Sequence, residues 1–154
     1  VTQTPWQPIA VWNNGADPNP ATDVIDENSN PDGNSFATWM LNVMGSTVRG
    51  QIPIASGTGK TTAANMDTTI AERWTYLMGT MRPQNFQFTT PINVQPAERC
   101  GKVVFSDMHV SGNGSTAAYP TGCGDYPTPR DLTPQEKALA FMLFDLASCL
   151  NVIL

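Results

Sequence analysis

The sequence predicts an α/β or α+β fold, in which a mostly parallel sheet portion with one antiparallel hairpin carries a helix on one face. Three observations favour this class. Residues 102–110 are apolar at first and polar at their end, which is typical of a strand buried on both faces. Residues 133–146 have the pattern of an amphipathic helix. Two alternating segments, 73–78 and 85–90, indicate the hairpin.

Two helices are predicted from their start and stop signals. Asp32 or Asn34 can cap a helix over residues 35–44. The second helix begins at a capping box, in which Thr133 and Glu136 each satisfy a backbone donor near the other. Its apolar stripe, which we expect to pack on the sheet, is Leu139, Met142, Leu143, Leu146 and Leu150.

The chain divides into two parts by composition. Residues 1–31 are rich in Pro and Asn, so they are predicted to be an extended, loop-rich segment with one short strand at 9–12. Residues 32–154 are predicted to be the α/β domain, which we expect to be the carboxyl-terminal part of a larger domain. A further short strand is predicted at 51–54, and a long loop at 111–131.

Composition excludes two classes of protein. Lys and Arg number 8 against 13 Asp and Glu, so the net charge is -5, and no basic cluster favours binding to nucleic acid. No apolar run approaches the roughly 20 residues that a membrane-spanning helix needs. Only 14% of residues are charged and there are three Cys, which together favour a secreted or cell-surface protein.

Several runs resemble known proteins. The residues CGKVVFSDMHV (100–110), YPTGC (119–123) and LTPQEKALAFMLFDL (132–146) resemble the carboxyl end of a group of uncharacterised bacterial secreted or lipoprotein-type proteins. The succession of strand, histidine, loop and helix also resembles the last part of class I glutamine amidotransferase-like domains. That resemblance implies a flavodoxin-like sheet. The half of those domains that carries the nucleophile has no match in this chain.

His109 is the only histidine, so any imidazole chemistry must use it. Asp107, two residues earlier, would share its face of a strand and could orient the ring. By resemblance, His109 falls where an amidotransferase histidine would lie, but that mechanism needs a reactive Cys on a strand-to-helix turn and a Glu partner. The alternative that we favour is a histidine that holds the following loop by hydrogen bonds.

Oxygen-bearing side chains alternate in one acidic loop. Asp26, Asn28, Asn30 and Asp32 could supply several of the ligands that Ca²⁺ takes. The loop departs from the EF-hand pattern, because Pro31 stands where that pattern has Gly. The simpler alternative is a solvated acidic loop at the amino end of the first helix, where negative charge is favourable.

The cysteines suggest one disulfide. If the second helix packs antiparallel to the strand at 102–110, Cys100 and Cys149 lie at the same end of the sheet, and we expect them to pair. Cys123 would remain in the long loop, unpaired or bonded to a cysteine elsewhere.

The function that the sequence favours is non-enzymatic: a secreted or cell-surface bacterial domain for binding or extracellular assembly. Its expected partner is the upstream part of the same polypeptide or another extracellular chain. One alternative is a hydrolase or amidotransferase-like domain that uses His109 with residues outside this chain. Another is a carbohydrate-binding module, with Trp74 and Tyr76 on one strand face as a stacking surface.

Overall fold

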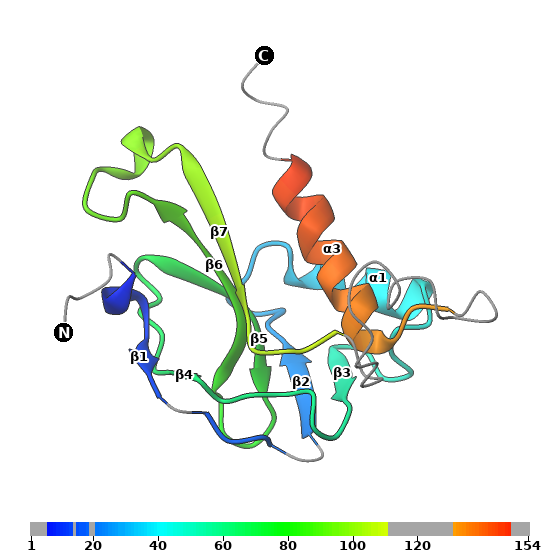
Figure 1. The fold of residues 1–154 in the computed structure, drawn as a ribbon. Coiled ribbons are helices and arrows are strands. Elements are labelled where there is room, and N and C mark those ends of the chain that lie inside the picture. Colours follow the sequence, from blue (N-terminus) through cyan, green and yellow to red (C-terminus); the bar gives the residue numbers. More distant parts are fainter. Residues whose placement is uncertain (1–5, 14, 19–20, 111–130, 149–154) are drawn as a thin grey trace, which may run out of the picture.

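A computed structural model describes residues 6–13, 15–18, 21–110 and 131–148 (Figure 1). Its centre is one five-stranded sheet in the order β3-β2-β5-β6-β7. The strands are β2 (Ala21–Ile25), β3 (Gln51–Ile54), β5 (Ala71–Leu77), β6 (Pro83–Thr90) and β7 (Gly101–Ser106). A second sheet pairs β1 (Val11–Trp12) with β4 (Ala63–Ala64).

The prediction of a mostly parallel sheet is wrong, because every strand pair in both sheets is antiparallel. A parallel connection needs a dozen or more residues to cross over. The connections at 78–82 and 91–100 are shorter than that, so β5, β6 and β7 form an antiparallel meander. The hairpin predicted at 73–78 and 85–90 is confirmed as β5 and β6.

The strand at 102–110 is shorter and more exposed than predicted. β7 ends at Ser106, and all its residues are half-buried. It pairs with β6 at the edge of the sheet, so it is not a central strand covered on both faces. The prediction rested on the apolar run Val103, Val104 and Phe105. Val104 packs against the apolar cluster on one face of the sheet, and Val103 and Phe105 pack against the cluster on the other face, so an edge strand also has such a run.

Two helices cover one face of the sheet, α1 (Gly33–Asn42) and α3 (Pro134–Ser148) (Figure 1). Both were predicted. The capping box of α3 is confirmed: the backbone N–H of Thr133 donates to Glu136 Oε2 at 2.7 Å, and that of Glu136 donates to Thr133 Oγ1 at 3.2 Å. α1 begins two residues earlier than expected, at Gly33. A Cβ there would lie 2.2 Å from the Asp26 carbonyl oxygen, so only glycine fits.

Aromatic rings join the helices to the sheet. Phe141 of α3 stacks on Phe36 of α1, with ring centroids 4.6 Å apart, and meets Trp74 of β5 edge-on at 5.8 Å. Trp74 and Phe36 are fully buried. Burial of such large rings stabilises a domain by several kcal/mol, so we take this cluster to be the main anchor of α3.

The opposite face carries a second apolar cluster. It is built on Phe86 and Phe88 of β6 and is covered by the short helix η1 (Gln7–Ile9) and by the β1–β4 pair. The segment at 1–31, predicted to be loop-rich with one short strand at 9–12, contributes β2 to the main sheet between β3 and β5. It also contributes η1 and β1 to this cover, and β1 falls within the predicted strand. A second short helix, η2 (Pro96–Glu98), lies between β6 and β7.

In the described ranges, no helix has the length and hydropathy that crossing a bilayer requires.

Candidate functional site

Asp107 and His109 follow β7, but the structure does not bring their side chains together. The Asp107 carboxylate accepts hydrogen bonds from the backbone N–H groups of Thr62 at 2.9 Å and Ala63 at 3.2 Å, and from the Thr62 hydroxyl. Asp107 is buried. Its carboxylate therefore fixes the segment that leads into β4, and no hydrogen bond from His109 reaches it among the described residues.

His109 is held by its backbone. Its N–H donates to the Thr58 carbonyl at 2.6 Å, and its own carbonyl accepts from Gln135 Nε2 at 2.8 Å. The side chain is exposed. The residue joins the 58–62 loop to the start of α3, while its imidazole faces solvent. The predicted Asp–His pair fails because the strand ends at Ser106, so the alternation that would place both side chains on one face stops before them.

Sequence reasoning missed a buried carboxyl group in the centre of the sheet. Asp23 of β2 is fully buried, and its Oδ2 accepts a hydrogen bond from the Thr75 hydroxyl at 2.9 Å. The Thr75 oxygen in turn accepts from Asn85 Nδ2 at 2.7 Å. Asp23 Oδ1 and Asn85 Oδ1 have no hydrogen-bond partner among the described residues.

Burial raises the pKa of Asp23 to about 7, the Thr75 hydrogen bond opposes part of that rise, and the nearby Asp107 charge adds to it. A signal for this group exists in the sequence. Ala21, Asp23 and Ile25 occupy alternate positions of β2 and therefore face the same side of the sheet. Because Ala21 and Ile25 are apolar, the acid between them is expected to face the core.

The acidic loop at 26–32 is organised around Arg73. Asp26 Oδ2 lies 2.7 Å from Arg73 Nη2, and its Oδ1 accepts the Ser29 backbone N–H at 3.0 Å. Asn30 Oδ1 accepts from the Asp32 N–H at 2.9 Å, and its amide donates to the Arg73 carbonyl at 3.0 Å. The Arg73 guanidinium therefore occupies the position beside Asp26 that a bound cation would need.

Burial alone would raise the pKa of Asp26, but the Ser29 hydrogen bonds and the adjacent Arg73 guanidinium outweigh it and hold that pKa below its ordinary value. In the part of the chain that the structure describes, no three His, Cys, Asp or Glu side chains form a group that could hold a metal ion. Asn28 and Asp32, the other predicted ligands, are exposed. Calcium binding at this loop stays a prediction.

The predicted disulfide lies partly outside the described residues. Cys100 is exposed just before β7 and forms no disulfide with another residue in the described ranges. Cys149 and Cys123 fall in the ranges that the structure does not describe, so their pairing also stays a prediction.

Trp74 and Tyr76 do not form a common stacking surface. The register of β5 on β6 shifts between Arg73 and Thr75, which leaves Trp74 as an extra residue in the ladder. Trp74 then lies in the core against the helices, whereas the Arg73 guanidinium stacks over the Tyr76 ring at 4.4 Å. The alternation that predicted one shared face is broken by this bulge.

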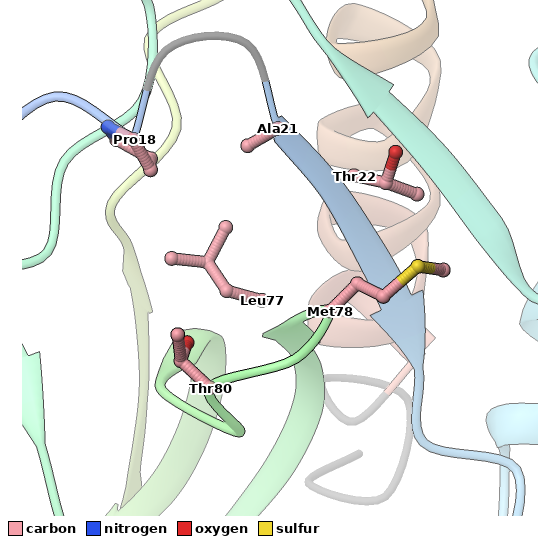
Figure 2. Close-up of a pocket in the computed structure, with 6 residues that line it drawn as sticks. All are labelled: Pro18, Ala21, Thr22, Leu77, Met78 and Thr80. Atoms are coloured by element: carbon pink, nitrogen blue, oxygen red, sulfur yellow. The ribbon is translucent and has the colours of Figure 1, made fainter.

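Several surface depressions are large enough for a small ligand, and two of them border the ends of strands in the main sheet. The first has a volume of about 370 Å³ and is lined by Pro18, Ala21, Thr22, Leu77, Met78 and Thr80 (Figure 2). It presents methyl, thioether and hydroxyl groups and no titratable side chain, so it offers contact without acid–base chemistry. The second, of about 400 Å³, lies at the ends of β5, β6 and β7, where Glu72, Gln87 and Lys102 line it.

No family model matches this chain, and no curated protein or solved structure matches it either.

Proposed function

We propose that this chain is a non-enzymatic binding domain of a secreted or cell-surface bacterial protein. The observation that carries the proposal is the position of Asp107. Its carboxylate is committed to Thr62 and Ala63, while His109 contributes only backbone contacts. The residues that could have started a proton relay are used to hold the loop and the helix in place.

An exposed apolar strip on the face opposite the helices also supports binding. We define this strip as Trp6, Val11 and Trp12. Trp6 is 48% exposed and Trp12 is 37% exposed, although Trp12 packs edge-on against Phe105 at 5.1 Å. Large apolar groups left in water at neighbouring positions are typical of surfaces that a partner covers.

The extracellular location and the partner belong to the same proposal. Low charge, three Cys and the resemblance of the carboxyl-terminal runs to bacterial secreted proteins support export. Another extracellular chain, or another part of the same polypeptide, is the partner that we propose for the apolar strip.

Turnover measurements test the absence of catalysis. We expect the wild-type chain to hydrolyse L-glutamine no faster than a buffer blank, and p-nitrophenyl acetate no faster than the same concentration of free imidazole, since an exposed imidazole alone cleaves activated esters slowly. The matched variant is His109→Ala. Saturable glutamine or ester hydrolysis that is lost in this variant, with the circular dichroism spectrum unchanged, would contradict the proposal.

A further inference from the structure

The helix α3 is apolar on its outer side as well as on the side that packs against the sheet. Ala138 and Met142 are buried beneath it. Four residues on the opposite side have the i, i+3, i+4 and i+7 spacing of a single stripe, which we name the outer stripe: Ala140, Leu143, Phe144 and Ala147. Between residues 138 and 147 only Asp145 is polar, and a helix that is apolar all round is typical of a buried position.

The outer stripe is nevertheless exposed to solvent. Leu143 is 52% exposed and Phe144 is 66% exposed. Ala147 is exposed and Ala140 is half-buried. In the described ranges, α3 contacts β3, α1 and β7, and these contacts leave the outer stripe open (Figure 1). Adjoining large apolar side chains that are this exposed are typical of a surface that another chain covers.

The outer stripe has the same order of small and large side chains in both directions along the helix. Its two ends are Ala140 and Ala147, and its middle is Leu143 and Phe144. When two copies of α3 lie antiparallel about a two-fold axis at this middle, Ala140 faces the partner's Ala147, and Leu143 faces the partner's Phe144. An interface of this symmetry uses the same patch on both copies. The stripe is therefore complementary to itself, which favours a second copy as its partner.

The charges of α3 favour the antiparallel direction. Glu136 lies one turn before the outer stripe on the same side of the helix, and its Oε2 accepts the Thr133 N–H at 2.7 Å. A parallel pair would place two Glu136 carboxylates side by side, where they repel. An antiparallel pair places them about 22 Å apart along the axis, at a rise of 1.5 Å per residue. Lys137 and Asp145 form ion pairs within their own chain.

We propose that two copies of this chain associate through the outer stripe as an antiparallel, two-fold symmetric helix pair. This surface is separate from the apolar strip to which the proposed binding function assigns another chain. A contact limited to one stripe of a 15-residue helix is smaller than the roughly 1,200 Å² of standard interfaces, so the dimer is weak and reversible. At the low micromolar concentrations of an unfolding experiment the chain is therefore a monomer.

Sedimentation equilibrium of the wild-type chain between about 10 µM and about 1 mM tests the dimer, because this range spans the dissociation constants of weak complexes. We expect the weight-average mass to rise toward twice the monomer mass. Phe144→Glu places a charge in the middle of the interface and should raise the dissociation constant at least about tenfold. The matched control is Val11→Glu, because Val11 is 52% exposed but lies on the apolar strip. It should leave the dissociation constant unchanged.

Two double variants test the direction of the pair. Ala140→Glu with Ala147→Lys brings opposite charges together twice in the antiparallel pair, so the dimer should persist. Ala140→Glu with Ala147→Glu brings like charges together at the same two places, so the dimer should be lost. In a parallel pair each position would face its own copy, and both double variants would lose the dimer equally. Circular dichroism shows whether each variant keeps its helices.

A wild-type mass that stays at that of the monomer up to the highest concentration would overturn the proposal without any variant. A dimer that Val11→Glu weakens and Phe144→Glu does not would place the interface on the apolar strip and would also overturn it. Equal loss of the dimer in both double variants would contradict the antiparallel pair. None of these results bears on the non-enzymatic binding function, which fails through turnover dependent on His109.

Discussion

At the scale of single residues, polar groups inside the sheet are the least ordinary feature of this molecule. Asp23, Thr75 and Asn85 form a hydrogen-bonded row across three strands with apolar surroundings. Burial of the Asp23 carboxyl group favours its protonated form over its ionised form, because the ionised form loses more hydration.

Asp23 should make the stability of the chain depend on pH. Its pKa rises to about 7 in the folded state from a value of 3.8 when it is exposed. The folded state therefore holds the proton more tightly, and the free energy of unfolding should fall as pH rises from about 4 through about 7. The full loss from a shift of this size is on the order of 4 kcal/mol.

Urea unfolding between pH 4 and pH 8 measures this effect. Asp23→Asn keeps an oxygen that can accept from Thr75 and cannot ionise, so this variant should lose much less stability over the same range. An equal fall in both proteins would show that Asp23 is not the group responsible.

At the scale of elements, local patterns identified the helices and the hairpin, but not the direction of the strands. The capping box at Thr133 and the spacing of Phe36 and Met40 are local signals. α3 begins where the capping box predicted, and α1 formed two residues earlier than its predicted range. Strand direction depends on which strands meet, and the apolar run at 103–105 reads the same in a parallel centre and at an antiparallel edge.

The candidate site was harder to predict from the sequence than the fold. Asp107 and His109 lie two residues apart in the chain, but β7 ends at Ser106, so the alternation of a strand does not place their side chains together. Asp23 and Gln87 are hydrogen-bonded to residues 52 and 15 positions away in the chain, Thr75 and Glu72. Such pairs can be predicted only when the register of the sheet is known.

The attachment of α3 should depend on one aromatic side chain. Phe141→Ala removes the ring that stacks on Phe36 and meets Trp74, and it should lower the free energy of unfolding by about 3 kcal/mol. Phe144→Ala is the matched control on the same helix, because that ring is 66% exposed. It should change stability by less than about 0.5 kcal/mol.

Thermal and urea denaturation of the two variants give the comparison directly. Equal losses for Phe141→Ala and Phe144→Ala would mean that α3 does not pack on α1 and β5 through Phe141.

At the scale of the whole molecule, the helices close one face of the sheet and the short β1–β4 pair covers part of the other (Figure 1). This arrangement leaves the apolar strip partly exposed at the rim of the second apolar cluster, where Trp6 and Trp12 contact its aromatic rings. Binding is therefore proposed at exposed apolar side chains, which leave the interior of the sheet unchanged.

Cross-strand NOE contacts measured by NMR test most directly the antiparallel order β3-β2-β5-β6-β7, which is the central claim about the fold. We predict contacts between Gln87 and Val104, between Val24 and Tyr76, and between Asp23 and Ile52, with the neighbouring pairs running in opposite directions along each strand. Contacts that run in the same direction along both strands, or a β7 that meets a strand other than β6, would contradict the account.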